Sequence, residues 1–302
     1  METAIALLIF NRADTTKRVF EAVRQAKPRK LLVVADGPRV DRPGEAEKCA
    51  ATRNVIEQVD WDCDVLTNYS NSNLGCGVRI STGLDWVFSE VEEAIILEDD
   101  CLPHPHFFDF CEVLLDRYRD DERIMHIDGN HHLIDYRNQS SKYSYYFSRY
   151  PLIWGWATWR RAWQHYDFKV ERLKEFIDDG WLEKFLENKR DTYVWERNFG
   201  GLYGNLYTWD YQWILTCWIH QGLAIHPEVN LVSNIGFGAE STHTRNDKNP
   251  FSSLPTKALT FPLTHPPFMI RDSEADHHLQ NTQFDPSKLN RLKMTFRHVL
   301  NQ

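Results

Sequence analysis

Three consecutive acidic residues, Glu98, Asp99 and Asp100, follow directly after an apolar run at residues 95–97. Such a run is typical of a buried strand in a parallel sheet. In open α/β sheets the ligand crevice lies beyond the carboxyl ends of the strands, so these carboxylates are expected to face a site. Like charges packed together cost free energy unless a cation neutralises them, and a divalent ion carrying a pyrophosphate would do so. A solvated acidic turn is the alternative, and the triplet alone leaves both interpretations open.

Further polar residues follow the three earlier apolar runs, where strands are expected to end. The candidates for ligand contacts are Asn11, Arg12, Asp36, Arg39, Asn73, Gly75 and Arg79. Asp36 could accept a hydrogen bond from a base N–H, and Arg39 or Arg79 could donate a bidentate pair to phosphate. Gly75 would let the backbone approach a ligand closely, although a tight turn before a helix also explains a glycine.

A separate carboxylate, Asp210, lies among aromatic residues at the start of an apolar helix predicted at residues 214–220. A carboxylate within hydrogen-bond reach of a hydroxyl can act as a general base. A carboxylate at this place can instead cap the helix, and the sequence leaves that alternative open. Glu196 and Asp191 are weaker candidates for a base.

The elements that must position these residues alternate regularly in the first hundred residues. Apolar periodicity predicts strands at residues 5–10, 31–35, 64–68 and 94–97, and helices at 15–26, 46–59 and 77–90. This alternation predicts an α/β fold, with a mostly parallel sheet flanked by helices on both faces. The first strand is not followed by G-x-G-x-x-G and the chain contains no P-loop motif, so a nucleotide would be held in another way.

The second half is predicted less regularly. A helix is expected at residues 157–166, amphipathic helices that form a lid or acceptor wall at 167–200, and a strand at 230–233. Asp276, His277 and His278 could imitate a metal cluster, but they lie in a polar tail that is expected at the surface, so no metal is assigned there.

Composition limits the possible functions. The chain has 302 residues, of which 42% are hydrophobic and 26% charged, as in an ordinary globular protein. Its net charge of −8 argues against nucleic acid as a partner, because no basic surplus is available to neutralise phosphates. The eleven tryptophans exceed what a core needs, and flat apolar rings with a polar edge point to carbohydrate.

No targeting or membrane-spanning segment is visible in the sequence. The longest early apolar run, residues 4–10, is far shorter than the roughly 18–20 residues that a membrane span needs. The six cysteines are scattered without a C-x-x-C pair and are expected to be reduced thiols. A cytoplasmic location is therefore expected.

Taken in order, four segments resemble a known family. They are FNR near the N-terminus, VVADGPR, NxNLGCGxxIxxGLDWVF and AIILEDDCLPHPHFFDF. Together they resemble nucleotide-sugar glycosyltransferases of the GT-A fold, and most closely the group related to N-acetylglucosaminyltransferase I, which includes bacterial polysaccharide and glycan enzymes. The resemblance covers residues 3–130, with recognisable pieces to residue 245.

The resemblance implies a role for individual residues. Glu98-Asp99-Asp100 would be the D-x-D motif, with Asp100 binding Mn²⁺ or Mg²⁺ and the other two acids directed towards ribose and donor sugar. Asp36 would lie at the nucleobase, commonly uracil, and residues 71–79 would close over the diphosphate. Asp210 would be the catalytic base of an inverting transfer, and His243 would complete the metal shell.

The sequence therefore predicts a metal-dependent, inverting glycosyltransferase that moves a sugar from a nucleoside diphosphate, commonly UDP, to a glycan hydroxyl. Residues 1–130 would bind the nucleotide sugar, and residues 131–302 would bind the acceptor, within one continuous domain. Two alternatives are a sugar-phosphate nucleotidyltransferase and a non-catalytic sugar-binding protein. The first normally carries glycines after the first strand, which residues 11–14 lack, and the second leaves the acidic triplet unexplained.

Overall fold

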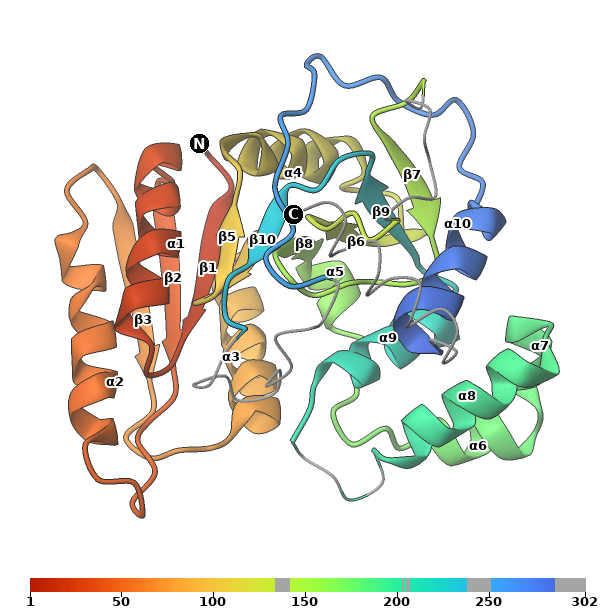
Figure 1. Cartoon of the computed structure of the whole chain (residues 1–302), viewed down its shortest axis with the longest axis horizontal. Helices are drawn as coiled ribbons and strands as arrows, with labels where there is room; N and C mark the ends of the chain where they lie inside the picture. The colour runs from red at the N-terminus through yellow and green to blue at the C-terminus, as the bar shows by residue number, and fades with distance from the viewer. Residues whose placement is uncertain (134–141, 203, 205–206, 238–250, 286–302) are drawn as a thin grey trace, which may run out of the picture.

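A computed structural model describes residues 1–133, 142–202, 204, 207–237 and 251–285 (Figure 1). Helices surround a central sheet of eight strands in this part of the chain. In spatial order the strands are β3 (Asp64–Tyr69), β2 (Lys30–Ala35), β1 (Ala4–Ile9), β4 (Glu93–Glu98), β8 (Trp156–Trp159), β6 (Ile124–Asp128), β9 (Leu223–Pro227) and β7 (Tyr145–Ser148). The prediction of an α/β fold is confirmed.

Most of the sheet is parallel. Strands β3, β2, β1 and β4 pair in parallel, and β6 pairs in parallel with β9. Strand β8 lies antiparallel between β4 and β6, and β7 pairs antiparallel with β9. Strand β6 therefore runs in the same direction as β4, so their carboxyl ends lie along the same edge as those of β1, β2 and β3.

Side-chain alternation in the strands explains why helices cover both faces of the sheet. On β1, Ile5, Leu7 and Ile9 belong to the core that α1 and α4 complete, whereas Ala6 and Leu8 belong to the core on the α3 side. The first face is covered by α1 (Ala13–Ala26), α2 (Glu45–Asn54) and α4 (Pro105–Arg117). Helix α2 lies beside α1 and is followed by the short helix η1 (Ile56–Gln58). The helices of the second face are α3 (Cys76–Glu90), α5 (Arg160–Trp163) and α9 (Asp210–Ile219).

A third core lies beyond α9 and reaches the edge of the sheet at Tyr146 of β7. Trp195 and Phe199 meet Leu215 and Trp218 of α9 in this core, so α9 is enclosed on two sides. This placement explains why α9 is apolar around most of its circumference. The helices that contribute are α6 (Leu173–Asp178), α7 (Trp181–Leu186), α8 (Lys189–Gly200) and α10 (Ser273–Leu279), which continues into η2 (Gln280–Phe284). Figure 1 shows α6, α7 and α8 together at the side of the molecule opposite β3.

A short ribbon of two antiparallel strands lies directly after the acidic triplet. Strand β5 (Cys101–Pro103) pairs with β10 (Val232–Asn234), and Asn234 lies opposite Cys101. The backbone N–H of Ile235 also donates to the carbonyl of Asp100 at 2.8 Å. Residues more than 130 positions apart in the sequence are thereby brought to the end of β4.

The helix predicted at residues 157–166 is confirmed only as the short α5 (Arg160–Trp163), and its predicted first residues are wrong because β8 occupies Trp156–Trp159. Trp156 packs into the core on the α3 side, whereas Ala157 and Trp159 pack into the opposite core. This alternation is that of a strand buried on both faces, and a helix could not insert between β4 and β6.

Two expectations about the surface also differ from the structure. Asp276 is fully buried on α10, where it accepts a hydrogen bond from the Ser148 hydroxyl at 2.6 Å. The tryptophans are mostly core residues rather than exposed faces for sugar rings. Seven of those between positions 154 and 218 are buried, namely Trp156, Trp159, Trp163, Trp195, Trp209, Trp213 and Trp218.

All six cysteines are free thiols. In the part of the chain that the structure describes, none of the helices combines the length and the apolar character that crossing a bilayer requires.

Candidate functional site

The acidic triplet lies at the carboxyl end of β4, where it meets Arg12 from the end of β1. Asp99 and Asp100 are buried, and only 3% and 9% of their surface is exposed. The Arg12 guanidinium pairs with Asp99 and, at 2.9 Å, with Oδ2 of Asp100. Arg12 is the residue directly before α1, so the start of that helix determines where the Arg12 guanidinium lies. One arginine thus bridges two carboxylates at the sheet edge.

This single arginine does not balance the negative charge around it. Burial, together with the charges of Asp100 and Asp99, raises the pKa of Glu98 well above its ordinary value, and the Asp210 charge adds to the effect. Burial raises the pKa of Asp99 to about 6 despite the opposing charge of Arg12. Oδ2 of Asp99 is buried without a hydrogen-bond partner among the described residues. Counting only the described residues, the cluster is therefore short of positive charge and of hydrogen-bond donors.

The Cys76 thiol at the start of α3 shows which carboxylates share this environment. Burial raises its pKa, and the charges of Glu98, Asp210, Asp36 and Asp99 raise it further. These four acids come from the ends of β2 and β4 and from α9. The structure thus brings the predicted base into the same electrostatic site as the triplet.

Asp36 at the end of β2 organises the loop before α3. Its two oxygens accept hydrogen bonds from the backbone N–H groups of Gly37, Leu74 and Gly75 and from the side-chain amide of Asn73, at 2.8–3.1 Å. These four bonds use the acceptor sites that a carboxylate offers. Asp36 holds the loop in place here, and its role at a nucleobase stays a prediction.

The remaining candidates for nucleotide contacts have protein partners. Arg39 donates from Nε to Glu45 at 2.9 Å, and Asn11 donates to the same carboxylate at 3.0 Å. Arg79 is buried and donates to the carbonyl of Ala35 at 3.1 Å and to the side chain of Asn68 at 2.7 Å. In this arrangement Arg79 ties together the ends of two strands, and Arg39 remains partly exposed at the rim.

Asp210 is the first residue of α9, and its carboxylate accepts a hydrogen bond from the Thr208 hydroxyl. Trp209 occupies the N-cap position, and Asp210 is the acidic residue of the first turn. The helix dipole favours a carboxylate there, so the alternative role of Asp210 in stabilising the helix start stays open. Of the two weaker candidates, Glu196 is exposed on α8, and Asp191 is buried on the same helix beside Arg149 and Arg190.

Gly236 closes one side of the acidic cluster. A Cβ at this position would lie 2.0 Å from Oδ2 of Asp100 and 2.7 Å from a guanidinium nitrogen of Arg12. The backbone after β10 therefore packs directly on the Arg12–Asp100 pair, which only glycine allows. His243, the predicted second metal ligand, lies outside the described residues.

Three residues of the site were not predicted from the sequence, namely Glu45, Thr208 and Gly236, and Cys76 was included in the predicted segment 71–79 without a role of its own. Cys76 lies inside the NLGCG segment and Thr208 is two residues before Asp210, so proximity to the motifs was a usable signal for both. Glu45 and Gly236 carry no local signal, because their partners are distant in the sequence.

The donor set fits a divalent cation that also binds phosphate. The oxygens of Asp100, Glu98 and Asp99 are hard ligands, and Oδ2 of Asp99 is an acceptor that no donor of the described residues reaches. Among the described residues no group of three His, Cys, Asp or Glu side chains is arranged to hold an ion by itself. Mg²⁺ is commonly bound through one or two carboxylates plus substrate phosphates, and such a site needs no closed cage.

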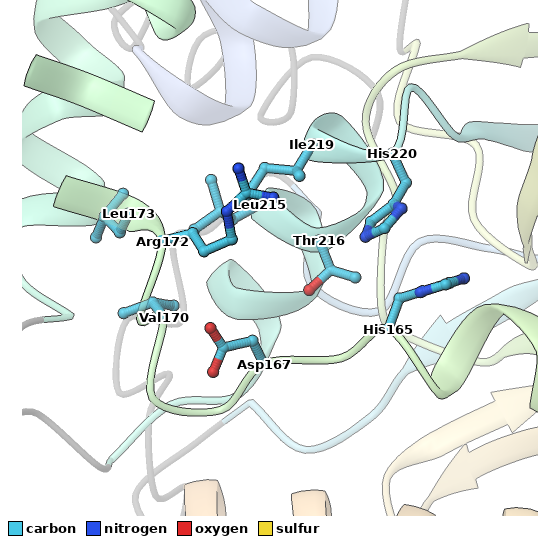
Figure 2. Close-up of a pocket in the computed structure, with 9 residues that line it drawn as sticks. All are labelled: His165, Asp167, Val170, Arg172, Leu173, Leu215, Thr216, Ile219 and His220. Atoms are coloured by element: carbon cyan, nitrogen blue, oxygen red, sulfur yellow. The ribbon is translucent and has the colours of Figure 1, made fainter. Parts of the chain in front are cut away.

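A concavity of about 70 Å³ lies at the C-terminal end of α9, the end opposite Asp210 (Figure 2). His165 and His220 stack there with ring centroids 4.2 Å apart, near Arg172. Its α9 residues include Leu215 and Ile219, which lie on the helix side opposite Asp210 given the helical repeat of 3.6 residues. This concavity is therefore separate from the site at the sheet edge.

No family model and no curated protein matches this chain. Solved structures of low similarity do match. A mannosyltransferase from Pyrobaculum calidifontis with GDP-Man and Mn²⁺ is 14% identical over 52% of this chain and 45% of its own, with a TM-score of 0.36. The galactosyltransferase LgtC with donor and acceptor sugar analogues is 9% identical over 97% and 96%, with a TM-score of 0.39. An apo UDP-glucose pyrophosphorylase is 11% identical over 74% and 90%, with a TM-score of 0.38.

The match thus spans less than half of the mannosyltransferase. Similarity at this level says nothing about what this chain binds, and the chemistry has to be inferred from its own residues.

Proposed function

We propose that this protein is a metal-dependent, inverting glycosyltransferase of the GT-A type, which uses a nucleoside diphosphate sugar, most simply a UDP-sugar, as donor. The observation that carries the proposal is the placement of the carboxylates: the buried acidic triplet meets Arg12 at the end of β4, and Asp210 stands on a separate element, at the start of α9. The charge of Asp210 also acts on Glu98 and Cys76, as the charges of the triplet do. One carboxylate set is suited to the donor, and a separate carboxylate is suited to the acceptor.

In the proposed reaction the acceptor hydroxyl oxygen attacks the anomeric carbon of the donor. The new C–O bond forms as the bond between the sugar and the diphosphate breaks, and the diphosphate leaves with the electron pair. Asp210 takes the proton of the attacking hydroxyl, since a positioned carboxylate is an effective general base. A divalent ion, when bound, supplies the Lewis acid that stabilises the charge on the leaving diphosphate.

The other residues bind and orient the donor. Asp100 would hold the cation, Glu98 and Asp99 would face the ribose and the donor sugar, and Arg12 would turn part of its guanidinium to the diphosphate. Asp36 and Asn73 keep the loop before α3 in place, so that Gly75 can approach the phosphates. His243 as a further ligand remains part of the proposal.

The acceptor would be a glycan, bound by elements that follow residue 130. Trp181 on α7 and Tyr193 on α8 are 52% and 66% exposed, and they could offer apolar faces to sugar rings. The choice of UDP, the glycan acceptor and a cytoplasmic location stay predictions.

The two alternative functions, a sugar-binding protein and a sugar-phosphate nucleotidyltransferase, are less well supported, for different reasons. The case for a non-catalytic sugar-binding protein depended on the number of tryptophans, and most of these are core residues. A nucleotidyltransferase would join a sugar phosphate to a nucleoside triphosphate and release pyrophosphate, a reaction that gives Asp210 no hydroxyl to deprotonate.

One experiment separates the three functions. The purified protein is incubated with a panel of nucleoside diphosphate sugars, with Mn²⁺ or with EDTA, and release of the nucleoside diphosphate is measured with glycan acceptors present. A parallel reaction contains UTP and sugar 1-phosphates, and pyrophosphate is measured. The proposal requires Mn²⁺-dependent nucleoside diphosphate release, whereas pyrophosphate formation from UTP would assign the protein to the nucleotidyltransferases.

A further inference from the structure

A buried chain of polar groups connects β6 to α9. His126 on β6 is fully buried, and its Nδ1 accepts a hydrogen bond from the indole Nε1–H of Trp213 at 3.1 Å. Its Nε2 lies 2.7 Å from the carbonyl of Leu152 and 3.1 Å from Oδ1 of Asp128. The ring of His126 therefore has polar partners on both sides inside the core.

These partners determine the orientation of the imidazole. An indole N–H can only donate, so Nδ1 must accept and the proton of a neutral ring lies on Nε2. Asp128 is fully buried and held in turn, because it accepts from the Leu152 N–H at 3.0 Å and lies 3.0 Å from Nε2 of His226. Asp128, at the Nε2 side of the His126 ring, thus keeps Nδ1 on the other side directed towards the Trp213 indole.

Aromatic stacking connects the same histidine to the residue next to Asp210. The ring of His126 stacks on Trp156, with centroids 4.9 Å apart and planes at 17°. Trp156 stacks on Trp209 at 5.7 Å and 22°. Trp209 immediately precedes Asp210, and Trp213 lies one turn further along α9. Two residues that flank Asp210 on the helix are therefore seated against His126 and its stacking partner.

We propose that His126 is a positioning residue for Asp210. Apolar packing is not directional, so packing alone would let α9 rotate or slide in its apolar surroundings. A hydrogen bond has a preferred length and angle, and the His126–Trp213 bond supplies this constraint near the first turn of the helix. The inference rests on the proposed function, in which Asp210 is the base.

Two matched substitutions at position 126 separate positioning from simple core stability. His126→Asn places an amide oxygen near Nδ1 and keeps the acceptor for Trp213, but it loses the contact with Asp128. His126→Gln reaches towards Asp128 and loses the acceptor for Trp213. Each variant breaks one side of the same buried chain, so both are expected to melt at lower temperature by similar amounts. Trp213→Phe keeps an aromatic ring and removes the donor.

Turnover and donor binding are measured for all three variants. We expect kcat to fall about 10- to 100-fold in His126→Gln and Trp213→Phe, because a displacement of about 1 Å at a reacting group can cost that much. The Kd for UDP with Mn²⁺ should stay unchanged, and His126→Asn should keep kcat within about threefold of wild type. Equal losses of kcat in the Asn and Gln variants would mean that His126 serves only the core.

Asp210→Asn is measured alongside, so that the two proposals can fail separately. If Asp210→Asn removes turnover and His126→Gln does not, the positioning role is wrong and the proposed function stands. If Asp210→Asn keeps wild-type turnover, the base assignment is wrong. Crystal structures of the two His126 variants give a readout without activity, since an unmoved Asp210 carboxylate in His126→Gln would overturn the inference.

Discussion

Arg12 faces two carboxylates at the sheet edge, and among the residues that the structure describes its one positive charge leaves the cluster of Glu98, Asp99 and Asp100 negative. Oδ2 of Asp99, buried and without a hydrogen-bond partner in the same part of the chain, marks this deficit at the level of a single atom. A bound cation would relieve the repulsion among the acids, and so would removal of one carboxylate. Adding the cation and removing a carboxylate should therefore both stabilise the fold. The cation should strengthen binding of a nucleoside diphosphate, whereas loss of the carboxylate should weaken it.

For Asp100→Asn we expect Mn²⁺-dependent binding of UDP to be lost and the melting temperature without ligand to stay equal or rise. Wild-type protein should gain about 2.7 kcal/mol of stability at a ligand concentration 100 times its Kd, and the variant should gain almost none. Thermal shifts with UDP and Mn²⁺ measure this, and Asp116→Asn on the exposed side of α4 is the control. Wild-type affinity in Asp100→Asn would exclude the metal role.

Asp210→Asn keeps the size of the side chain, and its amide can still pair with the Thr208 hydroxyl. The amide cannot take a proton, so kcat should fall about 10²- to 10⁴-fold, the usual contribution of a general base. The Kd for UDP and Mn²⁺ should barely change, because the base contacts the acceptor. Turnover within about threefold of wild type would move the assignment to another group.

At the scale of elements, the ribbon of β5 and β10 decides the shape of the site. Gly236 follows β10 and leaves no space for a Cβ against Asp100 and Arg12. Gly236→Ala should displace the Arg12–Asp100 pair and weaken binding of UDP with Mn²⁺ at least about tenfold, since loss of about 1.4 kcal/mol is enough. Gly200→Ala at the end of α8 is the control, because a Cβ there meets nothing within 4 Å. Equal binding in both variants would show that the ribbon does not shape the site.

The elements were predicted well where local periodicity decides them. The predictions for residues 5–10, 31–35 and 77–90 are confirmed by β1, β2 and α3, because apolar residues recur there with a period that fits one element. Strand β8 was missed because it has only four residues, two of them tryptophan, which is too few to show a period. Its conformation is set by its insertion between β4 and β6. Likewise, no local pattern could show that Gly236 lies against Asp100 or that Trp213 donates to His126.

At the scale of the whole molecule, His132 connects three distant segments of the chain. It follows the end of β6, stacks on Phe251 with centroids 4.4 Å apart and accepts or donates a hydrogen bond at 2.8 Å with Gln283 of η2. Its ring also contacts Trp154 at 5.2 Å, edge to face. Only 2% of its surface is exposed, so the ring is part of the interior that holds the C-terminal segments on the sheet.

This burial makes the stability of the protein depend on pH. Burial lowers the pKa of His132 from 6.5 to about 4, so between these values the unfolded chain binds a proton that the folded chain does not. The contribution of His132 to stability is therefore complete above pH 6.5 and is lost as the pH falls towards 4, by at most about 3 kcal/mol. His132→Phe keeps the ring and cannot titrate, so its free energy of unfolding in urea should fall less between pH 7 and pH 4 than that of wild type. Identical slopes in wild type and His132→Phe would show that the acid sensitivity comes from other groups.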